Sequence, residues 1–271
     1  MEPVLKDETF KQLRDFIYEK SGIFISDTKK YFLENRLIRQ IKDANLQNFE
    51  DYLYLLKYSL NGNVLSKLFD AVTTNETFFF REASQIEVFF DHVLPEIVAD
   101  KKTKIAKVWS AACSTGEEPY TIVMMHAEKK PDIRIDVLAS DISDGVLASA
   151  MNGVYNPYSV RNIPELYLKK YFRITGQTFE LDHGIKKGVK FMNINLIDEK
   201  KMKPIRDIDV LFCRNVLFYF DDRAKQKVVS LLYDSLKPKG FLFLSASESL
   251  HSVTRAFKPV IFNKAIVYQR V

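Results

Sequence analysis

Cysteine is scarce in this chain, and long hydrophobic runs are missing. The two cysteines, Cys113 and Cys213, stand too far apart for the paired spacing of a zinc site. No apolar run approaches the length needed to span a membrane, and residues 1–8 lack the basic-then-apolar order of a signal peptide. We therefore expect a cytoplasmic protein with free thiols, no bound metal and no insertion into a membrane.

Signatures of nucleic-acid and dinucleotide binding are missing too. The formal charge of +5 is mild, and no dense run of lysine and arginine alternates with aromatic residues, so we expect no nucleic-acid partner. The G-x-G-x-x-G turn of nicotinamide-dependent dehydrogenases is absent. No segment resembles a coiled coil or a long amphipathic seam, so we expect a monomer.

Residues 1–72 show only helical periodicity, which predicts a small all-helical domain. The apolar positions that recur at spacings of three and four are Phe10, Leu13, Phe16, Ile17, Leu33, Leu37, Ile41, Phe49, Leu53, Leu56, Leu60, Val64, Leu65, Leu68, Phe69 and Val72. The expected helix caps are Asp7 or Thr9, then Ser26 or Asp27, then Asn48, with Ser21-Gly22 ending the first helix. Residues 73–104 follow as a connector and a further helix.

From about residue 105 the pattern alternates strand, turn and helix, which predicts a doubly wound, mostly parallel sheet over residues 105–271. The predicted strands are 106–111, 133–139, 209–213, 241–244 and a closing antiparallel pair, 260–263 and 265–269. An insertion at about 171–193 breaks the alternation. Its three apolar pieces, 172–174, 178–181 and 189–191, are separated by glycines and predict a small antiparallel β-lobe.

The most informative segment runs from Val108 to Tyr120. A short apolar run ends in small residues, and Gly116 is followed by two carboxylates, Glu117 and Glu118, that open a helix. A first strand meets a nucleotide-sized ligand in this way, through close backbone approach and the free N–H groups of a helix start. Acidic residues disfavour a pyrophosphate here. A ligand with a cationic or hydroxyl-rich part fits better, and S-adenosylmethionine has both.

Asp141 ends the second predicted strand, at the carboxyl edge of the sheet. An acid at that place can accept hydrogen bonds from both hydroxyls of a ribose. The alternative is a helix cap ahead of Ser143. Ala111 either presents its backbone to the ligand or packs as filler, and spacing alone does not separate Glu117 from Glu118 as the acid that faces the ligand.

Five blocks of the sequence, in order, resemble the CheR-type chemoreceptor methyltransferases; they are Thr73–Glu82, Ser110–Tyr120, Ala139–Ile142, Asn195–Leu196 and Cys213–Phe220. The resemblance spans nearly the whole chain. It implies a class I methyltransferase with a doubly wound, mostly parallel sheet, an all-helical N-terminal domain and a small antiparallel β-lobe insertion. It also implies methyl transfer from S-adenosylmethionine to glutamate side chains of chemoreceptors, with S-adenosylhomocysteine as the product.

The resemblance implies site roles for residues of each block. Arg81 would lie beside the transferred methyl group, where its planar guanidinium could hold the acceptor glutamate. Tyr219 is the second candidate for the acceptor pocket, with a place in an aromatic core between Phe218 and Phe220 as an equal alternative. The expected cofactor-binding residues are Asn75, Thr77, Arg81, Ala111, Glu117, Asp141, Asn195, Leu196, Arg214 and Asn215.

A partner surface is expected on the second helix. Lys29, Arg36 and Arg39 lie near one another on one face, which is an ordinary solvated face by composition alone. The resemblance implies that a basic helix of this domain meets the acidic methylation helices of the receptor. Because the predicted lobe is compact, we expect no tether to a receptor C-terminal peptide.

Two other functions remain open from the residues. The same cofactor motifs would serve a methyltransferase acting on another protein or on a small molecule, although the helical domain and the lobe favour a large helical substrate. A non-catalytic module that binds S-adenosylmethionine is the third interpretation, and Arg81, Asp141, Asn215 and Tyr219 argue against it.

Overall fold

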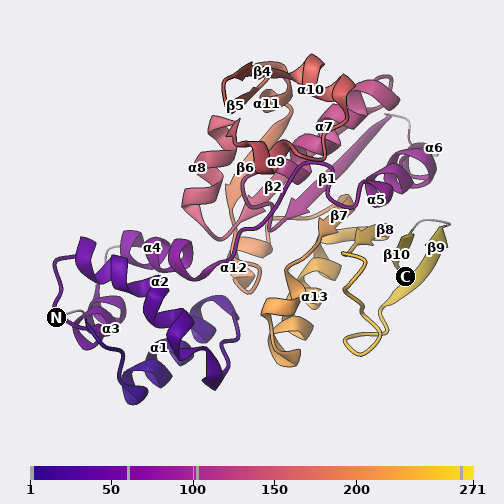
Figure 1. The fold of residues 1–271 in the computed structure, drawn as a ribbon. Coiled ribbons are helices and arrows are strands. Elements are labelled where there is room, and N and C mark those ends of the chain that lie inside the picture. The colour runs from indigo at the N-terminus through magenta and orange to yellow at the C-terminus, as the bar shows by residue number, and fades with distance from the viewer. Residues whose placement is uncertain (1–2, 60–61, 100, 102–103, 263–264) are drawn as a thin grey trace.

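The structure is a computed structural model that describes residues 3–59, 62–99, 101, 104–262 and 265–271. Leu60 and Asn263, expected at the ends of a helix and a strand, lie outside these residues. Figure 1 shows a helical unit at one end of the molecule and a larger unit built on a sheet. The helical unit contains α1 (Asp7–Ser21), the 3-10 helix η1 (Asp27–Lys29), α2 (Lys30–Asp43), α3 (Phe49–Tyr58) and α4 (Gly62–Val72).

The predicted apolar positions form the core of the helical unit, because each helix turns them toward the others. Leu13, Ile17, Leu33, Leu37 and Ile41 are fully buried in one cluster. Asn48 caps α3 as expected, its side chain accepting a hydrogen bond of 2.8 Å from the N–H of Asp51.

Two expected caps are wrong. The N-cap of α1 is Lys6, and Asp7 instead lies in the first turn, where its negative charge favours the helix dipole. Ser26 and Asp27 precede or begin the short helix η1 rather than capping α2. The end of α1 is as predicted: Gly22 has φ 74° and closes the helix in the left-handed conformation.

A connector leads from the helical unit to the sheet and then to α5 (Ala83–Val88), the π-helix η2 (Phe89–Val93) and α6 (Leu94–Ala99). Phe79 is fully buried and meets Tyr155 and Phe172 edge-on, with ring centroids 4.7 and 5.3 Å away. This aromatic contact holds the connector firmly, so the polar residues beside it keep fixed positions.

Seven strands of the described residues form one sheet in the order β6-β2-β1-β7-β8-β10-β9. The first five strands of this order, β6 to β8, are parallel to one another. Strand β10 pairs antiparallel with β8 and with β9, which closes the sheet as predicted. Their bounds are β1 (Ile105–Ala111), β2 (Arg134–Asp141), β6 (Val189–Asn193), β7 (Ile208–Cys213), β8 (Leu236–Phe243), β9 (Phe257–Phe262) and β10 (Ala265–Arg270).

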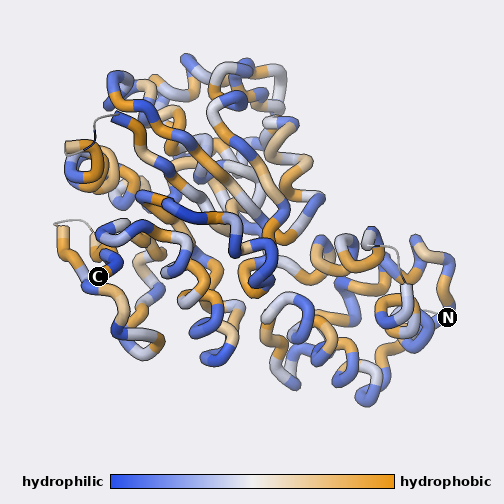
Figure 2. Tube along the Cα trace, turned by 180° about the vertical axis from the view of Figure 1, so that it is seen from behind, coloured by the Kyte–Doolittle hydropathy of each residue, from blue (hydrophilic) through white to orange (hydrophobic). Residues whose placement is uncertain are grey.

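Helices cover both faces of this sheet. Alternate residues of a strand point to opposite faces, so Val108 of β1 packs with α7 (Glu117–Lys129), while Trp109 packs with α13 (Asp222–Ser235). The central strand β7 is buried along its whole length. Figure 2 shows hydrophobic stretches along the central strands and more hydrophilic connecting segments. No helix of the described residues is long and apolar enough to cross a membrane.

The β-lobe differs from the prediction in one strand. A three-stranded antiparallel sheet has the order β3-β5-β4, with β3 (Val154–Tyr155), β4 (Phe172–Thr175) and β5 (Thr178–Leu181). The third expected piece is instead β6, which pairs in parallel with β2 at the edge of the main sheet. The composition of a short apolar segment does not specify which sheet it joins, because strand pairing depends on the neighbouring strands and on burial in the folded chain.

Short helices complete the unit: α8 (Asp144–Asn152), α9 (Pro157–Val160), α10 (Glu165–Tyr171), α11 (His183–Lys187), α12 (Glu199–Met202) and the 3-10 helix η3 (Leu217–Tyr219). The strand predicted at 241–244 is longer in the structure: β8 already begins at Leu236 and includes residues 238–240. The pairing of β8 with β7 shifts register between Leu236 and Phe241, so the strand is irregular over these residues.

Candidate functional site

A cavity lies where the helical unit meets the carboxyl ends of the sheet strands. Together with the open solvent at its mouth, the space within its walls is about 1060 Å³. Its walls come from five parts of the chain: the helical unit at 21, 23 and 72; the connector at 73–78, 81 and 86; the region after β1 at 112–114, 118 and 121; the ends of β2 and β6 at 141–142 and 194–196; and the loop after β7 at 214–216 and 219–220.

The turn after β1 is held by its own hydrogen bonds. The N–H of Cys113 donates to the carbonyl of Ser140, and the N–H of Gly116 donates to the carbonyl of Cys113. Gly116 has φ 90°, and a Cβ there would lie 2.9 Å from that of Ala150, so only glycine fits. The N–H groups of Cys113 and Gly116 are thus engaged within the protein and are not available to a phosphate.

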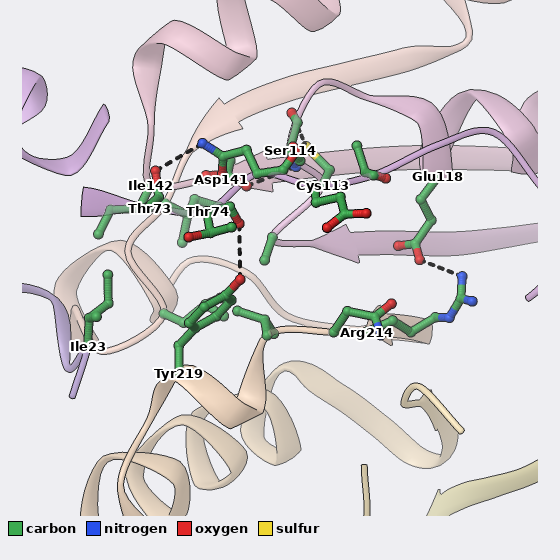
Figure 3. Close-up of a pocket in the computed structure, with 18 of the residues that line it drawn as sticks. Ile23, Thr73, Thr74, Cys113, Ser114, Glu118, Asp141, Ile142, Arg214 and Tyr219 are labelled. Atoms are coloured by element: carbon green, nitrogen blue, oxygen red, sulfur yellow. Dashed lines mark hydrogen bonds and ion pairs between the residues drawn. The ribbon is translucent and has the colours of Figure 1, made fainter. Parts of the chain in front are cut away.

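Asp141 lies at the wall beside this turn (Figure 3). One carboxylate oxygen accepts the N–H of Ser114 at 2.9 Å and the other accepts the N–H of Ser143 at 3.1 Å. The N-cap of α8 is Ser143 itself, so the capping alternative for Asp141 is wrong. Burial raises the pKa of Asp141, although these backbone N–H groups oppose the shift. A buried carboxylate of this kind favours ligands that donate hydrogen bonds to it.

The two glutamates after Gly116 point in different directions, and Glu117, the expected ligand, is not among the residues that line the cavity. Glu117 is buried away from the cavity, where the hydroxyl of Thr115 donates to it at 2.6 Å and where burial raises its pKa. Glu118 lines the cavity instead. Successive residues of a helix are about 100° apart, so only one of the two can face the ligand. Ala111 is likewise buried, and its neighbours 112–114 form the wall.

Arg214 joins three segments at the wall of the cavity. Its side chain is 2% exposed, and its guanidinium lies 2.8 Å from Glu118 and 3.0 Å from Glu82. It also donates to the carbonyl of Arg81 at 2.7 Å. Burial would raise the pKa of Glu82, but the charge and hydrogen bonds of Arg214 outweigh it and lower that pKa. The guanidinium expected to bind the cofactor is therefore committed to carboxylates of the protein.

The loop after β7 is held by a residue that sequence reasoning missed. Glu248 accepts the N–H groups of Asn215, Val216 and Leu217 at 2.8–2.9 Å, and that of Ser245 at 3.1 Å. Asn215 has φ 59°, a strained conformation for a residue other than glycine. The hydrogen bonds that this carboxylate accepts from the loop stabilise that conformation and keep Asn215 at the cavity wall.

We predict that Glu248→Gln weakens binding of S-adenosylhomocysteine by about tenfold or more. An amide can accept on one oxygen only, and its NH₂ would face N–H donors of the loop, which leaves buried donors without partners. Isothermal titration calorimetry measures the affinity. Asp182→Asn is the matched control, because Asp182 caps the distant helix α11. Equal affinity in Glu248→Gln and the wild type would contradict this role.

Tyr219 stands on the cavity wall, half-buried, and its hydroxyl donates to the carbonyl of Thr74 at 3.2 Å (Figure 3). The aromatic-core alternative is therefore wrong. Arg81 lines the same cavity from the connector and donates to the carbonyl of Glu76 at 2.9 Å. Asn75 and Thr77 also lie in the wall. The structure thus brings the two candidate catalytic side chains to one cavity.

Asn195 and Leu196 follow β6 at the opposite wall. The Asn195 amide donates to the carbonyl of Lys20 at 2.6 Å, and its oxygen accepts the N–H of Ile197 at 3.2 Å. This side chain, expected among the cofactor contacts, is therefore engaged within the protein, where it joins the sheet unit to the helical unit. Leu196 is 7% exposed and presents an apolar surface suited to packing on a base.

Comparisons with known proteins agree with this geometry. The chain matches the family described as CheR methyltransferase, SAM binding domain, over residues 75–266, and the family described as CheR methyltransferase, all-alpha domain, over residues 8–73. The chain belongs to the CheR methyltransferase family. It is an S-adenosylmethionine-dependent methyltransferase.

Several curated relatives cover nearly the whole chain. Chemotaxis protein methyltransferase 2 of Vibrio cholerae serotype O1 is 37% identical over 99% of this chain and 95% of that protein. The chemotaxis protein methyltransferase of Escherichia coli is 34% identical over 93% and 88%. Among solved structures, the DhpI-SAH complex aligns with 15% identity over 70% and 69% and a TM-score of 0.34, too distant a likeness to bear on function.

The residues of the CheR-family cavity suit S-adenosylmethionine. Asp141 offers a carboxylate for hydroxyl groups, and Leu196 and Ile142 offer apolar surface. Glu118 lines the cavity with its carboxylate paired to Arg214, and the N–H groups of Cys113 and Gly116 in the nearby turn are already engaged. When bound, S-adenosylmethionine supplies a methyl group activated by a positively charged sulfur.

Proposed function

We propose that this protein methylates glutamate side chains of chemoreceptors in chemotaxis signalling. The observation that carries the proposal is the meeting of Arg81 and Tyr219 at one cavity with Asp141 and Asn215. The relatives' names, chemotaxis protein methyltransferase, support the chemotaxis role. The separate helical unit, which forms one wall of the cavity, supports a large substrate that contacts both units.

The reaction requires the protein to position the glutamate carboxylate and does not require it to transfer a proton. A glutamate carboxylate is already ionised at neutral pH, so it needs no general base. The guanidinium of Arg81 would orient the carboxylate, and Tyr219 would shape the pocket around it. The walls of the cavity would exclude water from the carboxylate and so increase its reactivity.

Cofactor contacts form part of the proposal. Asp141 would bind the ribose hydroxyls and Leu196 would pack on the adenine. Glu118, in place of Glu117, would lie near the methionine part, while Arg214 would act by holding Glu118 rather than by direct contact. The remaining proposed contacts are Asn75, Thr77, Arg81, Asn215 and the backbone of Asn195.

Base treatment of the product tests the function. The protein is incubated with methyl-labelled S-adenosylmethionine and a chemoreceptor cytoplasmic fragment, and base is then added. Carboxyl methyl esters release volatile labelled methanol, whereas N-methyl products do not. Methanol release that disappears when the receptor glutamates are replaced by alanine is the expected result. Label that stays with the protein after base would disprove ester formation.

The receptor-binding surface is proposed on α2, around Lys29, Arg36 and Arg39. All three side chains are exposed. Arg36 also approaches the connector, with its guanidinium 3.5 Å from the carbonyl of Thr73, so this surface is continuous with the cavity wall. An acidic receptor helix lying there would reach the site, and the protein would act as a monomer.

We predict that reversing Arg36 and Arg39 to glutamate lowers kcat/KM for the receptor fragment by at least about tenfold, because surface charges at an interface guide and orient the partner. Affinity for S-adenosylhomocysteine should stay unchanged. Lys187 and Lys190, also exposed, provide a control reversal with the same change in net charge. Equal losses in the two variants would mean that only overall charge matters.

A further inference from the structure

Arg161 lies at the rim of the cavity, just after α9. Its guanidinium carbon is 3.7 Å from the ring centroid of Phe78 and 3.6 Å from that of Tyr158. Phe78 lines the cavity, and the hydroxyl of Tyr158 donates to Glu76, another residue of the cavity wall. Arg161 itself is exposed. Arg161 therefore places a positive charge directly beside Phe78 of the cavity wall.

The contacts of Arg161 leave N–H donors of its guanidinium available to an anion. Stacking occupies the flat faces of a guanidinium but leaves its in-plane N–H donors available for a carboxylate. Within the part of the chain that the structure describes, Arg161 donates to the carbonyl of Tyr158 and pairs with no carboxylate. Arg173 of the same lobe, by contrast, pairs with Glu180. The two rings also restrict the side chain, so less entropy is lost on binding.

Arg81 and Arg161 are close enough to act on one substrate helix. The guanidinium carbon of Arg81 lies 5.7 Å from the centroid of the same Phe78 ring, so the two guanidinium carbons are at most about 9.4 Å apart, the sum of the two distances. Residues three or four apart on a helix have Cβ atoms about 5–6 Å apart. Two carboxylates one turn apart could therefore reach both arginines together.

We propose that Arg161 is a specificity-determining residue that binds a second carboxylate on the substrate helix, three or four residues from the glutamate held by Arg81. This rests on the proposed function and refines its substrate class to glutamates with an acidic neighbour one turn away. The proposal has a consequence for the order in which two neighbouring glutamates are methylated. Because methylation neutralises a carboxylate, a methylated neighbour is a poorer partner for Arg161. The second glutamate of such a pair is therefore methylated more slowly.

The test uses a chemoreceptor cytoplasmic fragment that the wild-type enzyme methylates at one defined glutamate. In a second fragment, acidic residues three or four positions from that glutamate are replaced by glutamine. The wild-type kcat/KM should fall by about fivefold on this change, as expected for loss of an exposed ion pair. In Arg161→Gln the two fragments should react equally, and affinity for S-adenosylhomocysteine should be unchanged.

Matched variants separate this role from general charge and from folding. Arg173→Gln removes the same charge from the same lobe and should keep the wild-type preference between fragments. Arg161→Lys keeps the charge but loses the planar guanidinium, so this variant should keep only part of the preference between the fragments. A preference that persists in Arg161→Gln, or a wild-type enzyme that treats both fragments alike, would overturn the proposal. Absence of methanol release from every fragment would instead refute the proposed function.

Discussion

Replacing Asp141 with asparagine should weaken binding of S-adenosylhomocysteine by at least about a hundredfold. The change would remove the charged hydrogen bonds that we propose between Asp141 and the ribose hydroxyls, and the NH₂ group of the new amide would oppose the N–H of Ser114 or Ser143. Charged hydrogen bonds and buried donors without partners each account for about 1.5–3 kcal/mol, and a hundredfold change corresponds to about 2.7 kcal/mol. Isothermal titration calorimetry measures the loss.

Asp136→Asn is the matched control for this variant. Asp136 lies on the same strand, β2, but points to solvent beside Arg134. The Asp136→Asn variant should bind S-adenosylhomocysteine with the affinity of the wild type. If Asp141→Asn bound equally well while circular dichroism showed an intact fold, the ribose role of Asp141 would be refuted.

Replacing Arg214 with methionine should lower the free energy of unfolding by about 3–5 kcal/mol. Removing one partner of a buried ion pair leaves carboxylates without compensation, and here both Glu82 and Glu118 lose their partner. The change also frees the carbonyl of Arg81. Urea unfolding measures the loss, and Arg134→Met, an exposed arginine, should cost less than about 1 kcal/mol.

The deficit of Arg214→Met should shrink in acid. The folded-state pKa of Glu82 is lowered, so its stabilisation is present above the unfolded pKa of about 4.3 and disappears as pH falls through the folded pKa. Once Glu82 is protonated, it no longer needs the arginine. A difference between variant and wild type that stayed constant from neutral pH to about pH 3 would contradict this account.

Local patterns in the chain were sufficient for most of the fold. Helical spacing located the core residues Leu33, Leu37 and Ile41, and alternation of strand and helix indicated the parallel sheet. The amide of Asn48 caps its helix because its partner N–H is only three residues away. Such features depend on neighbours in sequence, so a pattern in the sequence can reveal them.

Direction and partnership within the site required the folded chain. The acids Glu117 and Glu118 are chemically identical, and only the placement of α7 in the fold shows that Glu118 lines the cavity while Glu117 does not. Similarly, Val189–Asn193 resembles the lobe strands in composition, but it pairs with β2. In both cases the competing positions differ in their surroundings and not in their side chains.

The sequence by itself determined the succession of helices and strands and the polar residues at the carboxyl edge of the sheet, because hydrophobic spacing and turn chemistry act over a few residues. Only the tertiary structure decided that Glu248 holds the loop at Asn215, that Arg214 serves Glu82 and Glu118, and that Arg161 stands at the rim. These contacts join residues from 33 to 132 positions apart, and no local pattern encodes them.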